Sequence, residues 1–224
     1  MLCTHCDMMS EKYLKLKEKY TMPENTDRPD SSSAEVHILF NGYARDGDTP
    51  TGSYVASTVG FIRDGDARVI IDPGMVPSPE AILEPLAALG ELPTNITDVV
   101  FSHHHPDHIL NAALFPNARF HDFWAIYKGD TWESREAEGF HLSPSIRLIA
   151  TPGHTPQDIT TLVGTREGTI AFTHLWWFAE GPAEDPLADD LAALHANRIR
   201  VLQVASLIVP GHGVPFIPDE TTPR

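Results

Sequence analysis

The sequence holds little cysteine, which limits how its fold can be stabilised. Only Cys3 and Cys6 occur among the 224 residues, and both lie near the N-terminus. A disulfide framework of the kind that holds small secreted domains together is therefore excluded. Long apolar runs are missing too: no stretch approaches the roughly 18 residues of a membrane span, and the N-terminus lacks the apolar core of a secretion signal. We expect a cytoplasmic protein without a membrane partner.

Basic residues are also scarce. Lys and Arg number 16 against 31 Asp and Glu, and the formal net charge is −15. The lysines between Lys12 and Lys19 form the only dense basic group in the sequence. Because a field of this sign repels phosphate backbones, we do not expect nucleic acid as a partner. A small-molecule substrate agrees better with this composition than a nucleic acid does. The composition gives no information about the oligomeric state.

The first 33 residues differ from the rest of the chain. Residues 11–20 have the composition of a short helix, and residues 23–33 that of a polar linker. Cys3-Thr-His5-Cys6 has the spacing of a redox or metal motif, but two thiols at a chain end without a preceding strand are more typical of a tail. We predict a mobile N-terminal extension over residues 1–33. One globular domain is predicted over residues 34–224, since hydrophobic residues make up 42% of the chain and allow a sizeable core.

Short runs of β-branched and aromatic residues predict the strands of this domain. We expect strands at Val36–Phe40, Tyr54–Ile62, Arg68–Ile71, 98–102, 118–121, 146–150, 159–163, 169–173 and Leu207–Val209. Helices are expected from Glu80 to about Leu89 and from about Leu187 to Val204. The elements fall into two similar halves, and mixed strands flanked by helices indicate a layered α/β architecture.

The run Ser102-His103-His104-His105-Pro106-Asp107-His108 is the most informative feature of the chain. It follows the expected buried strand at 98–102, so its side chains emerge at a strand end. Residues two apart in an extended chain point the same way, which brings His103 and His105 to one metal and turns His104 elsewhere. Pro106 suits the first turn of a helix, where Asp107 and His108 would lie beside a second metal.

Three more histidines complete the pattern. His154, His174 and His212 each follow or end an apolar run, where a strand can deliver a side chain to a shared edge. Imidazoles and carboxylates are the usual ligands of zinc and several other first-row metals, and a catalytic site keeps one position open for water or substrate. Clustered imidazoles repel one another unless a metal compensates. Four other histidines are expected to be structural: His37, His121, His141 and His195.

These segments resemble the motifs of the metallo-β-lactamase superfamily of metal-dependent hydrolases. The family's His-x-His-x-Asp-His motif is matched at residues 103–108, its Pro-Gly-His-Thr segment at 152–155 and its Pro-Gly-His-Gly segment at 210–213. The likeness covers roughly residues 34–217 and implies a four-layer αββα sandwich with metals at one edge between two sheets. It also implies one or two zinc ions, with iron or manganese as alternatives. Asp72 corresponds to a residue that orients a ligand histidine in this family, although an ordinary Asp-Pro-Gly turn also explains it.

One position departs from the family. Between His154 and His212 the family carries an aspartate that bridges two metals, and this chain has His174 there. A carboxylate has two oxygens that can bridge ions, whereas a neutral imidazole offers one lone pair. Three arrangements follow: one metal at His103, His105 and His154, with or without His174; two metals joined only by water or hydroxide; or an impaired site.

The resemblance implies hydrolysis by a metal-activated water, with Asp107 orienting that water or carrying its proton to the leaving group. The expected substrate is an ester, thioester, lactone or related small carbonyl compound. Residues 41–44, 114–116 and 209–216 are similar to the metallo-β-lactamase domain-containing protein 1 group, a member of which is associated with RNA cleavage. A phosphodiesterase or ribonuclease is therefore one alternative, and a metal-binding protein with lost or altered hydrolysis, because of His174, is the other. Trp176 and Trp177 either wall a substrate pocket or belong to the core.

Overall fold

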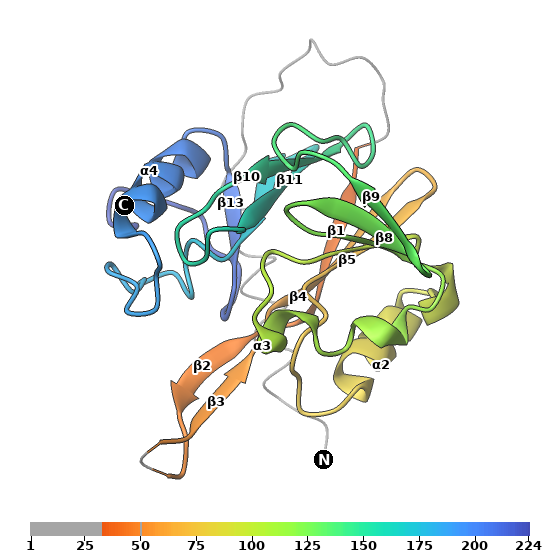
Figure 1. Cartoon of the computed structure of the whole chain (residues 1–224), viewed down its shortest axis with the longest axis horizontal. Coiled ribbons are helices and arrows are strands. Elements are labelled where there is room, and N and C mark those ends of the chain that lie inside the picture. Colours follow the sequence, from red (N-terminus) through yellow and green to blue (C-terminus); the bar gives the residue numbers. More distant parts are fainter. Residues whose placement is uncertain (1–32, 50) are drawn as a thin grey trace. The chain divides into compact units, whose positions relative to one another are not determined.

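Two β-sheets and a separate hairpin carry most of the chain that the computed structural model describes, residues 33–49 and 51–224 (Figure 1). The predicted N-terminal extension, apart from its last residue, lies outside these described residues. The larger sheet has the order β1-β4-β5-β6-β7-β8-β9 and consists of β1 (Glu35–Phe40), β4 (Val59–Asp64), β5 (Ala67–Ile71), β6 (Asp98–Val100), β7 (Arg119–His121), β8 (Ala125–Lys128) and β9 (Thr131–Ser134). The smaller sheet has the order β10-β11-β12-β13 and consists of β10 (Ile146–Ala150), β11 (Ile159–Thr165), β12 (Gly168–Thr173) and β13 (Leu207–Pro210). The hairpin pairs β2 (Tyr43–Asp46) with β3 (Ser53–Ala56).

Helices cover the outer faces of the two sheets. The described helices are α2 (Glu80–Ala88), α3 (Pro106–Ile109) and α4 (Leu191–Leu202), with the 3₁₀ turns η1 (Pro93–Asn95) and η2 (Ala112–Leu114). Figure 1 shows α2 beside the larger sheet and α4 beside the smaller one. Among the described residues, no helix has both the length and the apolar character needed to cross a membrane.

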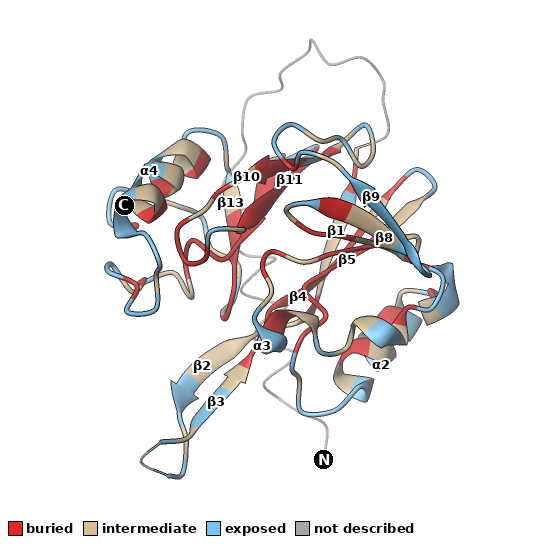
Figure 2. Ribbon diagram, viewed as in Figure 1, coloured by how far each residue is buried: buried red, intermediate tan, exposed pale blue. Residues whose placement is uncertain are grey.

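Alternation along the strands divides the core into three clusters. Figure 2 shows buried residues along the strands of both sheets and on one side of α4. In β5, Val69 and Ile71 belong to the cluster between the sheets, whereas Ile70 belongs to the cluster that includes α2. In β12, Phe172 faces the same inter-sheet cluster and Ala171 faces the cluster that includes α4. Burying an aliphatic or aromatic side chain of this size contributes roughly 1.5–3 kcal/mol. The succession of helix, sheet, sheet and helix confirms the predicted αββα sandwich.

The strand predicted over Tyr54–Ile62 is wrong as a single element. It divides into β3, which belongs to the hairpin, and β4, which belongs to the larger sheet. The break falls at Ser57 and Thr58, whose hydroxyls donate hydrogen bonds to the backbone carbonyls of Asp72 (2.9 Å) and Gly213 (2.9 Å). Side chains that bond to distant backbone groups compete with a continuous strand ladder, and here they redirect the chain.

The last helix and the balance of the two halves also differ from expectation. The helix expected from Leu187 begins at Leu191, because Asp190 Oδ1 accepts a hydrogen bond from the Ala193 N–H (2.9 Å) and caps the helix there. The two halves are less alike than predicted, because β8 and β9 extend only the larger sheet.

Strand direction gathers the sequence motifs at one edge of the sandwich. β5 and β6 are parallel, and β12 and β13 are parallel. β10 runs the same way as β12, since both are antiparallel to β11. The carboxyl ends of these five strands are closely followed in the chain by Asp72, His103, His154, His174 and His212.

Candidate metal centre

Seven ligand-type side chains gather at this edge: His103, His105, Asp107, His108, His154, His174 and His212. Four of them follow β6 in the larger sheet, and three come from loops of the smaller sheet. Their ligand atoms form groups within 4.8 Å of one another, among them His103 with His105 and His154, and Asp107 with His108 and His212. The structure thus brings together every residue predicted as a metal ligand. Ligation itself stays a prediction.

His103, His105 and His154 form the first group. His105 Nδ1 lies 3.1 Å from His154 Nε2, and the His103 ring centre lies 4.7 Å from that of His105. His103 and His154 are buried, whereas His105 is exposed to the cleft described below. His104 turns away as predicted: its Nε2 lies 3.0 Å from Asp122 Oδ2.

Asp107, His108 and His212 form the second group. Asp107 Oδ2 lies 3.5 Å from His108 Nε2 and 3.6 Å from His212 Nε2. Asp107 and His108 belong to the short helix α3, which begins at Pro106 as expected. Gly74 is required for the close approach of this segment, because a Cβ at that position would lie 1.6 Å from the Asp107 carbonyl oxygen.

His174 lies between the two groups. Its Nε2 is 3.0 Å from His212 Nε2, and its ring centre is 4.2 Å from that of His154. Gly211 makes room for the ring, since a Cβ there would lie 2.4 Å from His174 Cδ2. His174 also forms candidate ligand groups with His103 and His108, and with His154 and Asp185, so it adjoins both sets of side chains.

Asp72 holds the His108 ring. Its Oδ2 accepts a hydrogen bond from His108 Nδ1 (2.9 Å), and its Oδ1 accepts one from the Ser102 N–H (2.6 Å). Because the proton is on Nδ1, Nε2 of His108 presents a lone pair to the centre. Asp72 has a φ of 49°, a left-handed conformation that Asp tolerates better than most residues. These contacts fit the orienting role proposed for Asp72 from the sequence.

Similar hydrogen bonds orient His154 and His212. His154 Nδ1 donates to Asp185 Oδ2 (2.7 Å), and His212 Nδ1 donates to the Ala56 carbonyl oxygen (3.0 Å). A neutral imidazole that donates through one nitrogen offers a lone pair on the other. Both rings therefore direct Nε2 lone pairs into the centre.

Burial keeps most of these rings neutral. Burial, and then the neighbouring imidazoles, lowers the pKa of His103 and of His174 well below the usual range. Burial and then the nearby His108 lower the pKa of His212 to about 4. For His108 itself, burial opposes protonation, but the Asp72 carboxylate outweighs it and raises the pKa. Neutral rings carry the lone pairs that a metal ligand needs.

Three ring nitrogens show that a metal ion fits these residues. His103 Nε2, His108 Nε2 and His174 Nδ1 are buried and have no hydrogen-bond partner among the described residues. A buried polar atom without a partner costs roughly 1–3 kcal/mol of folding free energy, so three such atoms at one place would strongly destabilise the fold. Divalent cations of the zinc type satisfy such nitrogens, and the surrounding set of imidazoles and one carboxylate is chemically suited to them.

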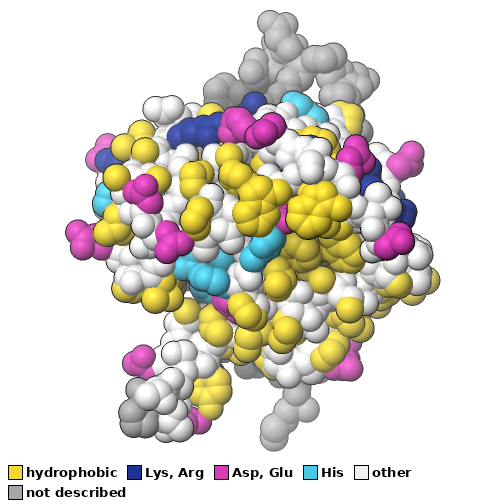
Figure 3. Space-filling view, viewed as in Figure 1, with side chains coloured by type: hydrophobic (Ala, Val, Ile, Leu, Met, Phe, Trp, Pro, Cys, Tyr) yellow, Lys and Arg dark blue, Asp and Glu magenta, His cyan; other side chains and the backbone are white. Residues whose placement is uncertain are grey.

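A cleft of about 390 Å³ opens onto the centre, with five of the seven side chains on its floor: His105, Asp107, His154, His174 and His212. One wall contains Trp177, Phe178 and Leu187, and residues 44–46 and 53–55 of the hairpin form the other. Figure 3 shows histidine side chains at the surface above the projecting hairpin, with hydrophobic side chains beside them.

The two adjacent tryptophans have different places. Trp177 lines the cleft, and its Nε1 donates to Asp185 Oδ2 (3.0 Å), which fixes the ring. Trp176 is fully buried in the cluster that includes α4, and its Nε1 donates to the Pro223 carbonyl oxygen (2.9 Å). The pocket interpretation therefore holds for Trp177 and the core interpretation for Trp176.

Comparison with family models identifies the family to which the chain belongs. The metallo-β-lactamase superfamily model matches residues 53–212, a range that includes all seven side chains. The chain belongs to the metallo-β-lactamase superfamily. The predicted superfamily of metal-dependent hydrolases is thereby confirmed.

Named relatives in the superfamily extend this likeness. Metallo-beta-lactamase domain-containing protein 1 of Xenopus laevis is 31% identical over 206 residues, which cover 88% of this chain and 87% of that protein. The human protein of the same name is 37% identical over 158 residues, which cover 66% of this chain and 59% of that protein. The predicted likeness to this group of the superfamily is confirmed.

Solved structures of the superfamily share the fold. A putative metallo-beta-lactamase from Thermotoga maritima superposes with a TM-score of 0.67 at 23% identity and covers 83% of this chain and 100% of its own. An N-acyl homoserine lactone hydrolase with product bound at its catalytic metal centre has a TM-score of 0.60 at 16% identity, covering 81% of this chain and 94% of its own. A dizinc quorum-quenching lactonase has a TM-score of 0.56 at 17% identity, covering 72% and 73%.

Two parts of this superfamily site were not foreseen from the sequence. Asp185, which bonds to both His154 and Trp177, lies in an irregular loop where only an Asp-Pro pair signals a turn. The cleft wall formed by β2 and β3 was missed because Tyr54 was assigned to a longer strand. The signal available for that hairpin was the run of turn-type residues from Gly47 to Gly52, which separates two short segments that contain Tyr43 and Tyr54.

Proposed function

We propose that this superfamily member uses two divalent ions, preferably zinc, to hydrolyse an ester, thioester, lactone or related small carbonyl compound. The observation that carries the proposal is the convergence of seven ligand-type side chains, five of which lie on the floor of a cleft. The lactone hydrolase among the structural neighbours supports a carbonyl substrate, and the dizinc lactonase supports the choice of metal.

The seven side chains divide into two sets of ligands. His103, His105 and His154 would hold one ion, and Asp107, His108 and His212 would hold the second. We add His174 to the second set because its Nε2 lies 3.0 Å from His212 Nε2. A set of three leaves a position for water or substrate, as catalytic zinc sites require, whereas a set of four is closed. When bound, the ions supply a Lewis acid for the carbonyl oxygen and lower the pKa of water to about 7.

The protein's own groups orient the reactants and move the proton. Asp107 lies on the cleft floor with Oδ2 within 3.6 Å of two imidazoles, where its carboxylate can take the proton of the attacking water and deliver it to the leaving group. Asp72 and Asp185 keep two ligand rings turned toward the centre. Trp177 and Phe178 give the cleft an apolar wall that contacts the uncharged part of a substrate.

A substrate panel with and without metal tests this function. Lactones, thioesters and simple esters are incubated with protein treated with a chelator and then reloaded with zinc. We expect hydrolysis to disappear with the chelator and return with the metal. Asp107→Ala should lower kcat by about 10²- to 10⁴-fold. The exposed Asp130, in the turn between β8 and β9, provides the control Asp130→Ala, which should keep wild-type turnover.

The alternatives give different results in the same experiment. Metal-dependent cleavage of phosphodiesters alone would favour a phosphodiesterase or ribonuclease, a role that the net charge of −15 opposes. Tight metal binding without turnover of any substrate would favour a metal-binding protein. Wild-type turnover in Asp107→Ala would remove Asp107 from the mechanism. A cytoplasmic location stays a prediction.

A further inference from the structure

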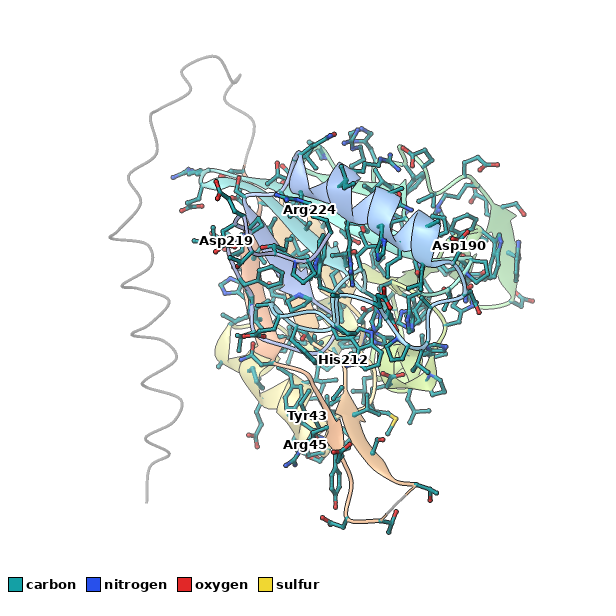
Figure 4. The ribbon with its side chains drawn as sticks, turned by 90° about the vertical axis from the view of Figure 1, so that its left-hand side faces the viewer. Tyr43, Arg45, Asp190, His212, Asp219 and Arg224 are labelled. Carbon is teal, nitrogen blue, oxygen red and sulfur yellow. The ribbon has the colours of Figure 1, made fainter. Side chains whose placement is uncertain are left out.

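The hairpin wall of the cleft carries a positive charge, Arg45, which does not belong to the candidate metal centre. β2 and β3 pair so that Arg45 stands opposite Tyr54, and Tyr43 lies two residues before Arg45 on the same face. Arg45 and Tyr54 both line the cleft. Figure 4 shows Tyr43 and Arg45 on the hairpin below His212, which belongs to the cleft floor.

Two aromatic rings hold the Arg45 guanidinium in place. Its Cζ lies 5.3 Å from the Tyr43 ring centre and 5.0 Å from the Tyr54 ring centre, within the range of cation–π contacts. The Tyr54 hydroxyl in turn donates a hydrogen bond to the Asp48 carboxylate, which fixes that ring. A guanidinium has five N–H donors and cation–π contacts use none of them as a hydrogen bond to an acceptor oxygen, so donors stay available for a planar anion. Because the rings restrict the side chain beforehand, less entropy is lost when an anion binds.

Among the described residues, Arg45 has no carboxylate partner, whereas most other strand and helix arginines have one. Within residues 33–49 and 51–224 no Asp or Glu is paired with Arg45, whereas Arg63, Arg119 and Arg200 are each paired with an acidic residue. Arg45 is also the only Lys or Arg among the described residues that line the cleft. In a chain with a net charge of −15, a cation at this position favours a negatively charged ligand that the rest of the protein repels.

We propose that Arg45 binds a carboxylate of the substrate, so that the substrate class is a carboxylate-bearing ester, thioester or lactone. The inference rests on the proposed hydrolase function and narrows it. The guanidinium fork matches the two oxygens of a carboxylate. The scissile carbonyl would lie over the floor of the cleft, and the apolar remainder would contact Trp177 and Phe178 on the opposite wall.

A matched substrate pair measures the role of Arg45. We would compare a glutaryl thioester with a free terminal carboxylate and the same thioester with a terminal carboxamide, using zinc-loaded protein. The measured quantity is the kcat/KM for the thioester with the carboxylate divided by the kcat/KM for the thioester with the carboxamide. We expect wild type to prefer the acid and Arg45→Gln to lower the ratio by roughly tenfold, as for an exposed charged hydrogen bond. Arg45→Lys, which keeps the charge but lacks the fork, should retain part of the preference.

Arg147 provides the matched control. It is an exposed arginine on β10 outside the cleft, so Arg147→Gln changes the net charge equally and should keep the wild-type ratio. An unchanged ratio in Arg45→Gln would overturn the proposal. An equal fall in Arg147→Gln would also overturn it, because the effect would then come from net charge.

A binding measurement separates this proposal from the proposed function. If wild type hydrolyses neither thioester, calorimetric titration of zinc-loaded protein with glutarate and with glutaramate still tests Arg45. Roughly tenfold weaker glutarate binding in Arg45→Gln, with glutaramate binding weakly to both proteins, would support the carboxylate site. Equal glutarate binding in both proteins would overturn it, as would Arg45-dependent cleavage confined to a phosphodiester.

Discussion

Asp72→Asn tests how the metal centre is oriented, because it changes one hydrogen-bonding atom and little else. The Asn side chain keeps an oxygen to accept from the Ser102 N–H, and Asn tolerates the φ of 49° at this position. It replaces Oδ2 by an NH₂ group that faces His108 Nδ1 at 2.9 Å. Two donors cannot share that contact. His108 must therefore move its proton to Nε2 or rotate, and either change removes the lone pair directed at the centre.

The expected loss in metal affinity can be sized from this contact. Removing such a supporting hydrogen bond typically weakens metal binding 10- to 100-fold, which corresponds to about 1.4–2.8 kcal/mol. Competition with a chromophoric chelator, titrated with zinc, measures the affinity of each ion. We expect the ion held by the set that contains His108 to lose affinity by this amount in Asp72→Asn, and chelator to inactivate the variant at a lower concentration.

Asp98 provides a control of the same kind away from the metal centre. Asp98 Oδ1 lies 2.8 Å from His121 Nε2, and both side chains are buried, but neither belongs to a candidate ligand group. Asp98→Asn should therefore lower the free energy of unfolding and leave metal affinity unchanged. The reasoning is refuted if Asp72→Asn binds zinc as tightly as wild type. It is also refuted if both variants lose affinity equally, because the loss would then reflect general destabilisation.

Three other substitutions test neighbouring parts of the structure. Elemental analysis should find two metals per chain in both wild type and His174→Asp, and one metal rising to two in the variant would show that His174 blocks the second site. Gly211→Ala, whose Cβ would lie 2.4 Å from His174 Cδ2, should cost about 1–3 kcal/mol in denaturant unfolding, whereas Gly164→Ala, with its nearest neighbour at 3.7 Å, should cost less than about 1 kcal/mol; equal losses would contradict this. Arg198→Met should cost about 3 kcal/mol or more, because this fully buried side chain donates to the carbonyls of Leu175, Pro182 and Ala183. Arg200→Met should cost less than about 1 kcal/mol, because the Arg200 side chain is 43% exposed and its ion pair with Glu138 lies at the surface. Thermal unfolding compares this pair, and a small loss in Arg198→Met would show that water replaces the guanidinium.

Local rules predicted where most of the candidate ligands lie in the chain, because these residues closely follow strands. His103 and His105 are two residues apart after β6, and the alternation of an extended chain separates them from His104, whose partner is Asp122. His174 follows β12 directly, so the end of its apolar run also predicted its place. The meeting of these strand ends, by contrast, depends on pairing between distant segments. For that, the family resemblance supplied what periodicity alone did not.

The cleft walls were less predictable because they depend on contacts distant in sequence. Ser57 and Thr58 look like ordinary strand residues, and only their bonds to Asp72 and Gly213 show why the chain turns out into the hairpin. Asp185 lies 31 positions from His154, and no local pattern connects the two. Arg45 became a candidate only when the hairpin placed it between two tyrosine rings at the cleft.

Each candidate ligand set takes residues from both sheets of the sandwich. His103 and His105 come from the larger sheet and His154 from the smaller, and the second set is divided in the same way. An ion bound there cross-links the two halves, so the free energy of metal binding adds to the free energy of folding. Chains without metal would open more often at this edge and expose themselves to proteolysis. Metal supply in the cell would then determine how long the protein survives as well as whether it is active.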